Sequence, residues 1–317
     1  MRLGRKQFDP VLKMLHPTTR REFLGAVAAA AALPLPGAEP EEPVLDLHQH
    51  TLYTGRPDSG LLAHQEHHKI HTTVILPGEG WMLSIVGGNR HSAAFTAAHP
   101  DRFVRFTSSD PAESRTEDLL RGNLRRGALG IGEMKYHVAA DSPEMHRVYR
   151  LAEELGVPVL IHFEYETYNT GLERFATVLK KYPKVSFIGH AQTWWGNISG
   201  DLDPLELYPK GPVKPGGLTD RLLGDYKNMY GDLSAGSGLN ALTRDPEFAR
   251  GFVARHARKL IWGSDCNCHD GMGGGIKSGF CIAERSLGAL GTLAPDRAAL
   301  RRILWENGAE LLRLKKS

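Results

Sequence analysis

Short apolar segments alternate with helix-like segments over most of the chain, and this alternation limits the possible fold more than any other feature. The apolar segments are rich in β-branched residues, which is typical of parallel strands that are buried on both faces. The predicted strands comprise residues 44–48, 72–77, 103–107, 128–134, 158–162, 185–190, 229–233 and 260–264. The predicted helices comprise residues 59–68, 92–99, 117–126, 143–155, 172–181 and 240–256.

Eight such units predict an α/β fold, a TIM-type (β/α)8 barrel that could be distorted. The alternative is an open doubly wound sheet, but no Gly-x-Gly-x-x-Gly motif follows the first strand. One connection, residues 191–226 after the sixth strand, is unusually long, and we expect it to lie over the barrel mouth. It contains Trp194 and Trp195, which either form a platform for a substrate or anchor the loop.

The N-terminal 38 residues differ in composition from the rest of the chain. Arg20 and Arg21 precede an Ala-rich run over 26–35 that is too short to cross a membrane, and the segment resembles a bacterial twin-arginine signal peptide. We therefore expect a signal peptide over 1–38, a catalytic domain over 39–317, and export to the periplasm or medium by the twin-arginine machinery. Without the signal, 33 basic and 34 acidic residues remain, so the net charge changes from +3 to −1. This balance removes the basic net charge as an argument for nucleic-acid or membrane binding, and we expect no nucleic-acid partner.

Cysteine and histidine are both clustered. The three cysteines, Cys266, Cys268 and Cys281, do not form a disulfide framework, because their number is odd and they all lie late in the chain. We expect Cys266 and Cys268 to pack beside Asp265 or support it, with a soft metal site as the alternative. Four histidines of the first helical unit are expected to be solvated, namely His64, His67, His68 and His71.

The ends of the predicted strands carry the residues that bear chemistry. In a (β/α)8 barrel the C-terminal ends of all strands meet at one face, where active sites form. Imidazoles and carboxylates together suit zinc best, with manganese or iron as alternatives. The candidate groups are His48, His50, Glu133, Lys135, His162, His190 and Asp265. This set predicts a metal site at the barrel mouth.

The motifs at these positions resemble the amidohydrolase superfamily. They are Asp-Leu-His-Gln-His (46–50), Gly-Glu-Met-Lys (132–135), Leu-Ile-His-Phe-Glu (160–164), Ile-Gly-His-Ala (188–191) and Trp-Gly-Ser-Asp (262–265). The segments 99–103 and 306–312 are similar to the amidohydrolase-related branch, which includes aromatic-acid decarboxylases and lactone hydrolases. The resemblance covers residues 44–314.

The resemblance implies roles for these residues. His48, His50 and His162 would be metal ligands, and Asp265 would be a ligand that also moves a proton. His190 would bind a second metal or act as an acid or base. Glu133 is favoured as a ligand or as a partner of the ligands.

Lys135 has two open interpretations. We favour it as a cation that anchors the substrate, and the alternative is an ion pair with Glu133 or Glu164. Since this interpretation leaves Lys135 out of the metal site, we expect about one ion per chain.

We therefore expect a metal-dependent hydrolase in which metal-activated water cleaves a C–O or C–N bond of a small lactone, ester or amide. The alternative is a metal-dependent, non-oxidative decarboxylase of an aromatic or unsaturated acid. No arginine, the preferred carboxylate clamp, lies at a predicted strand end, which favours hydrolysis, although Lys210, Lys214 or Arg221 of the long connection could supply a cation. A non-catalytic, exported metal-binding barrel is a further alternative. The expected partner is a small molecule, and a homo-oligomer is compatible with the sequence.

Overall fold

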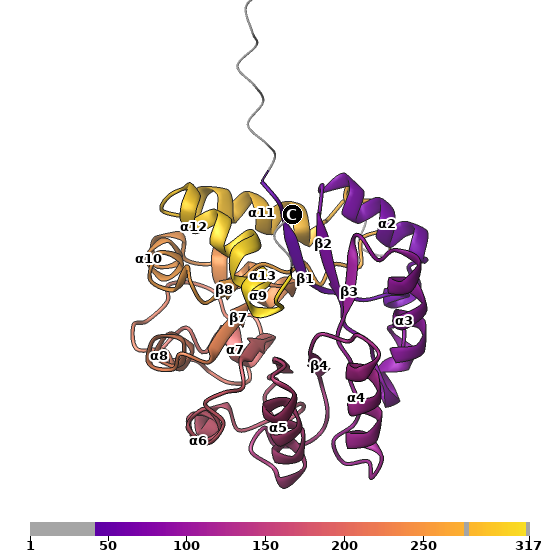
Figure 1. Cartoon of the computed structure of the whole chain (residues 1–317). Helices are drawn as coiled ribbons and strands as arrows, with labels where there is room; N and C mark the ends of the chain where they lie inside the picture. Colours follow the sequence, from indigo (N-terminus) through magenta and orange to yellow (C-terminus); the bar gives the residue numbers. More distant parts are fainter. Residues whose placement is uncertain (1–41, 276–278, 315–317) are drawn as a thin grey trace, which may run out of the picture. The chain divides into compact units, whose positions relative to one another are not determined.

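Eight short parallel strands form the centre of the described part of the chain, residues 42–275 and 279–314 of this computed structural model (Figure 1). They are β1 (Leu45–Gln49), β2 (Thr72–Ile75), β3 (Phe103–Arg105), β4 (Ile131–Met134), β5 (Val159–His162), β6 (Phe187–His190), β7 (Met229–Asp232) and β8 (Leu260–Ile261). Each strand pairs with the next in sequence within two sheets, β1–β3 and β4–β8.

Backbone hydrogen bonds join the two sheets into a ring. Between the β3 and β4 segments, the N–H of Leu129 donates to Arg105 O (2.8 Å) and the N–H of Thr107 donates to Gly130 O (3.0 Å). Between the β1 and β8 segments, the N–H of Leu47 donates to Trp262 O (3.1 Å). The predicted (β/α)8 barrel is therefore confirmed, with short strands and irregular pairing at the two joints.

The helices surround the strands in Figure 1. They are α2 (Asp58–His67), α3 (Asn89–Ala98), α4 (Thr116–Arg125), α5 (Pro143–Leu155), α6 (Phe175–Lys181), α7 (Gln192–Gly196), α8 (Leu218–Asp225), α9 (Ala235–Thr243), α10 (Pro246–His256), α11 (Ile282–Leu293), α12 (Arg297–Arg301) and α13 (Asn307–Leu311). Shorter helical turns are η1 (Tyr53–Gly55), η2 (Gly80–Ser84), η3 (Leu172–Arg174) and the π-helical η4 (Arg302–Glu306). None of the helices in the described part of the chain is long and apolar enough to span a membrane.

Capping residues explain which helix boundaries the sequence predicted well. The bounds of α5 match the prediction, because the Ser142 hydroxyl accepts from the N–H of Met145 and Gly156 ends the helix in the left-handed region. The single helix predicted over 240–256 is wrong. The Asp245 side chain caps α10 by accepting from the N–H of Phe248, so the segment forms α9 and α10.

The buried core has two parts. Leu47 of β1 and Leu160 of β5 belong to one cluster, although their strands are not neighbours, so this cluster fills the barrel interior. A larger cluster lies between the strands and the helices and includes Ile161, Phe175 and Val178. The interior is therefore packed with apolar side chains. The expected signal peptide lies outside the described residues.

Candidate active site and metal centre

Polar side chains from the C-terminal ends of the strands meet in one buried group. His48 and His50 come from the end of β1, and their Nε2 atoms lie 3.2 Å apart. Glu133 of β4 approaches both, with Oε2 3.8 Å from His48 Nε2 and 3.7 Å from His50 Nε2. Asp265, four residues after β8, approaches from the other side, with Oδ1 3.8 Å and 3.5 Å from the same two nitrogens.

Hydrogen bonds fix how the two β1 histidines point. His50 Nδ1 donates to the carbonyl of Leu76 at 2.7 Å, and His48 Nδ1 donates to Asp232 Oδ2 at 2.7 Å. When both rings are neutral, the two Nε2 atoms carry lone pairs that face each other. Two nitrogens about 2.05 Å from one tetrahedral ion would lie about 3.4 Å apart, so the observed 3.2 Å fits a shared cation.

Asp232 at the end of β7 was missed by the sequence reasoning. Its carboxylate contacts His48 Nδ1, His190 Nδ1 (3.2 Å) and the hydroxyl of Ser234 (2.8 Å), so it orients two site histidines at once. A Cβ at Gly263 would lie 2.8 Å from Asp232 Oδ1, which explains the glycine in the Trp-Gly-Ser-Asp motif. Its position in the sequence could have identified it, since Asp232 lies at the end of a predicted strand like the other candidates.

The buried carboxylates of this group need a positive charge beside them. Burial lowers the pKa of His48, but the carboxylates of Asp265 and Asp232 outweigh burial and hold it well above its ordinary value. Burial, with His48 nearby, lowers the pKa of His50 to about 4. Without a metal ion, a proton on His48 is therefore the charge that balances the carboxylates. A divalent cation could take the place of that proton.

Asp265 holds the least satisfied atom of the group. Its Oδ1 is buried and has no hydrogen-bond partner among the described residues. Its backbone φ of 44° lies in the left-handed region, where a non-glycine residue is strained, and its N–H donates to His48 O at 2.8 Å. An unpartnered carboxylate oxygen that faces two imidazole lone pairs fits a cation ligand.

A second group adjoins the first and shares Glu133 with it. His162 Nδ1 lies 2.5 Å from Glu133 Oε1, and His190 Nε2 lies 3.7 Å from the same oxygen. The other ring nitrogen of His162 lies 3.0 Å from Glu164 Oε2. Contact with His162 helps to hold the pKa of Glu133 well below its usual value, although burial opposes this shift. The residues Glu133, His162 and His190 could therefore hold a second ion.

A cavity of about 150 Å³ opens onto these groups. A larger cavity of about 600 Å³ lies beside α4; it is lined by carboxylates such as Glu79 and Asp110 but by no imidazole. The smaller cavity is lined by Tyr53, Lys135, His162, His190, Ala191, Gln192, Tyr208, Ala235, Gly236, Ser237, Asp265, Asn267 and Ile282. Since Gln192 and Tyr208 belong to the long connection after β6, that connection does border the mouth, with the helices α7 and α8 inside it.

The Lys135 ammonium lies against aromatic rings. Its Nζ is 5.6 Å from the centroid of Trp81 and 5.3 Å from that of Tyr168, and the two rings stack 5.1 Å apart. Among the described residues, no carboxylate lies within ion-pair distance of Lys135, so the alternative of an ion pair with Glu133 or Glu164 is not supported. Cation–π contacts leave the N–H groups of Lys135 free to bind a substrate anion.

Tyr53 was also missed, and it borders Asp265 in the cavity. Burial and the nearby Asp265 and Glu133 carboxylates raise the pKa of its phenol well above the ordinary value. The phenol therefore stays protonated and can donate a hydrogen bond to Asp265. No spacing in the sequence marks Tyr53, because it lies on the short turn η1 after β1.

The structure corrects the hypothesis that Trp194 and Trp195 form a substrate platform. Both indoles are buried, with 0% and 2% of their surface exposed. Trp195 Nε1 donates to Asp232 O at 2.8 Å, and Trp194 packs where a Cβ at Gly189 would otherwise lie. The alternative, two aromatics that anchor the loop, is the one that the structure supports.

A buried arginine holds the loop after β8 in place. Arg56, 0% exposed, donates to the carbonyls of Cys266 (2.7 Å) and Cys268 (3.0 Å) and to Gln49 Oε1 (2.6 Å). Cys266 and Cys268, which we expected to pack beside Asp265 or support it, are both buried, and so is Cys281. The expectation of solvated histidines is wrong for His64, which is 0% exposed.

Comparison with known proteins agrees with this geometry. The sequence model of a family described as amidohydrolase matches residues 64–314. No curated protein sequence matches the chain.

Several solved structures share the fold at low sequence identity. A probable 2-pyrone-4,6-dicarboxylic acid hydrolase from Acinetobacter baumannii, solved with citric acid bound, is 18% identical, with 86% of this chain and 100% of that chain covered and a TM-score of 0.58. A 2,6-dihydroxybenzoate decarboxylase from Rhizobium is 14% identical over 86% and 99%, with a TM-score of 0.54. A dihydroorotase from Campylobacter jejuni is 16% identical over 86% and 84%, with a TM-score of 0.53.

Proposed function

We propose that this chain, which belongs to the amidohydrolase family, is a metal-dependent hydrolase that cleaves a C–O or C–N bond of a small polar substrate. Lactones, esters and amides are the substrate classes that fit. The observation that carries the proposal is the meeting of three atoms that can each bind a cation: His48 Nε2, His50 Nε2 and the unpartnered Asp265 Oδ1. A divalent cation satisfies all three at once.

The residues that would hold the ion are His48, His50, Glu133 and Asp265. Zinc suits these donors best, with manganese and iron as alternatives. When bound, a divalent cation supplies Lewis acidity, which polarises a carbonyl and lowers the pKa of a water molecule. Because Glu133 is shared with the group of His162 and His190, we propose two adjacent ions rather than the single ion expected from the sequence.

Two residues of the chain, Asp265 and His190, can transfer protons. Asp265 borders the cavity and can accept a proton from the attacking water on the carboxylate. His190 Nε2 lies 3.8 Å from Asp265 Oδ2, and burial lowers the pKa of His190, so its ring is neutral at pH 7. Asp232 and Ser234 contact its Nδ1, so Nε2 either binds the second ion or, when one ion is bound, takes this proton and passes it to the leaving group.

The cavity supports a small substrate that carries one anionic or strongly polar group. Lys135 provides the cation, and Trp81 with Tyr168 keeps it in place from one side. A volume of about 150 Å³ suits a compact molecule rather than a polymer.

The choice between hydrolysis and decarboxylation rests on anion-binding groups. A decarboxylase must bind the carboxylate that it removes, and arginine forks do this best. Of the described residues that line the cavity, Lys135 is the only cation of the lysine or arginine type. Lys210, Lys214 and Arg221 of the long connection are not among its lining residues. Because both chemistries occur on this fold, the fold itself does not decide between them.

Isotope labelling tests the proposal. The purified protein is screened against lactones, esters, amides and aromatic acids, and the turned-over substrate is then converted in oxygen-18 water. We expect one labelled oxygen in the product, detected by mass spectrometry, and no turnover by the His50→Ala variant. Release of carbon dioxide without label would show that the protein is a decarboxylase instead.

The cellular location of the protein is a separate proposal. We propose export by the twin-arginine pathway on the strength of Arg20, Arg21 and the apolar run that follows them. That pathway carries folded proteins, so it is compatible with metal loading before export.

A further inference from the structure

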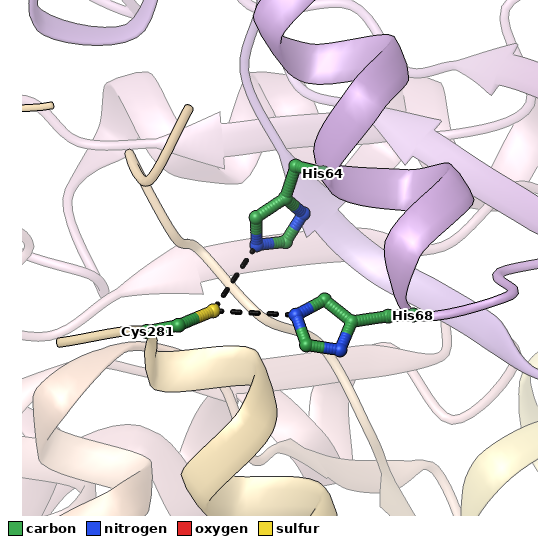
Figure 2. A group of neighbouring side chains, drawn as sticks. All are labelled: His64, His68 and Cys281. Atoms are coloured by element: carbon green, nitrogen blue, oxygen red, sulfur yellow. Dashed lines mark hydrogen bonds between the residues drawn. The ribbon is translucent and has the colours of Figure 1, made fainter. Parts of the chain in front are cut away.

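A second group of potential metal ligands lies apart from the active-site histidines, and it joins the helix α2 to the start of α11. Figure 2 shows His64 and His68, one helical turn apart, both pointing at the sulfur of Cys281. Cys281 Sγ lies 3.5 Å from His64 Nε2 and 3.3 Å from His68 Nε2. The three ligand atoms all lie within 4.8 Å of one another.

The hydrogen bonds around His64 fix its tautomer. Its Nδ1 lies 2.7 Å from Gln65 Oε1. The Gln65 amide nitrogen donates to Asp46 Oδ2 (3.0 Å) and to Thr73 Oγ1 (2.7 Å), so Oε1 must be an acceptor and the proton sits on His64 Nδ1. The lone pair of His64 Nε2 therefore points at Cys281. Metal-ligating histidines typically donate the N–H of their second ring nitrogen to such an acceptor.

The Cys281 sulfur meets an imidazole nitrogen from each of two histidines. When the proton of the neutral His68 ring is on Nδ1, its Nε2 lone pair faces the Cys281 sulfur at 3.3 Å, as that of His64 does at 3.5 Å. The Cys281 thiol has a single proton and can donate it to one imidazole only. A cation satisfies both nitrogens and the sulfur together.

The spacings fit tetrahedral coordination. For metal distances of about 2.05 Å to nitrogen and about 2.3 Å to sulfur, tetrahedral ligands lie about 3.5 Å apart for nitrogen and sulfur, and about 3.8 Å for two sulfurs. The observed values are 3.3 and 3.5 Å, and the Cys266 sulfur lies 3.8 Å from that of Cys281. We propose that His64, His68 and Cys281 bind a zinc ion, with Cys266 as the fourth ligand. Thiolate with imidazole is a donor set typical of structural zinc.

Such an ion would support the active site without taking part in it. It would tie α2 and α11 to the loop after β8, in which Cys266 directly follows Asp265. A chain of hydrogen bonds continues from His64 through Gln65 to Asp46, whose carboxylate accepts from the N–H of Ser264 (2.8 Å) and of His48 (3.1 Å). The proposal does not depend on the reaction that the barrel catalyses.

Cobalt substitution tests the site, because cobalt bound to thiolate gives a charge-transfer absorption in the near ultraviolet and the active-site ligands contain no sulfur. The full-length protein is stripped with a chelator under reducing conditions and titrated with cobalt. We expect the absorption in the unmodified protein and in His50→Ala, and its loss when zinc is added. We expect it to be reduced in Cys281→Ser, which leaves the Cys266 thiolate, and absent in the double variant Cys266→Ser/Cys281→Ser.

The matched control is Cys268→Ser, since Cys268 is equally buried but its sulfur contacts Asp270 and the N–H of Gly273. This variant should keep the absorption. If Cys281→Ser does not fold, His68→Gln serves instead, because His68 is only half-buried; it should weaken cobalt binding at this site by about tenfold or more. A protein that binds cobalt without the absorption would overturn the proposal. An absorption that survives in the double variant, an unchanged cobalt affinity in both Cys281→Ser and His68→Gln, or a Cys266–Cys281 disulfide that persists under reduction would do the same.

Discussion

Replacing Asp232 with asparagine should weaken metal binding at the active site while leaving the barrel folded. Asp232 is fully buried and accepts from His48 Nδ1 at 2.7 Å. Asparagine keeps the size of the side chain but can turn its amide N–H toward that nitrogen. His48 would then shift its proton to Nε2, which removes the lone pair that faces His50 and Asp265.

The expected magnitude follows from the two histidines that Asp232 holds. Loss of a partner that orients a metal-ligating histidine costs about 10- to 100-fold in affinity, or about 1.4 to 2.7 kcal/mol. Since Asp232 also contacts His190 Nδ1 at 3.2 Å, we expect the upper half of this range. The assay is competition for zinc against a chromogenic chelator at fixed pH, with circular dichroism to check the fold.

Asp220→Asn is the matched control. Asp220 also pairs with a buried histidine, His256 (2.5 Å), but this pair lies on α8 and α10, away from the strand ends. The Asp220→Asn variant should lower the stability of the protein and leave zinc affinity at the active site unchanged. An affinity of Asp232→Asn within about threefold of the unmodified protein, or an equal loss in Asp220→Asn, would refute the reasoning.

Four further predictions concern binding, pH and export. The His50→Ala variant should lose active-site metal and turnover but keep its circular dichroism, and full metal occupancy would remove His50 from the site. Lys135→Met should raise KM about 10- to 100-fold with bound metal unchanged; an unaltered KM would mean that Lys135 does not anchor the substrate. Because the pKa of His48 is raised, a proton competes with the metal, so zinc affinity should rise as pH increases through and above neutrality; affinity independent of pH would contradict that raised pKa. Changing Arg20 and Arg21 to lysine should trap the precursor in the cytoplasm, and unimpaired export would remove the twin-arginine assignment.

The sequence by itself determined the barrel and most of the candidate ligands. Strand and helix periodicity is local, so eight repeating units can be recognised without any knowledge of contacts. A parallel barrel then brings all strand ends to one face, which is why His48, His50, Glu133, His162 and His190 could be grouped before their distances were known. Helix bounds were predicted well where a cap lay next to the helix, as at Gly156.

The tertiary structure alone decided which atoms of these residues face one another. The tautomer of His48 depends on Asp232, 184 positions away, and the thiol of Cys281 meets His64 across 217 positions. It also decided that Trp194 is buried against Gly189 and that His64 is not a solvated helix residue. The local spacing of residues in the sequence does not predict such contacts, because the packing of distant segments decides which partner a side chain meets.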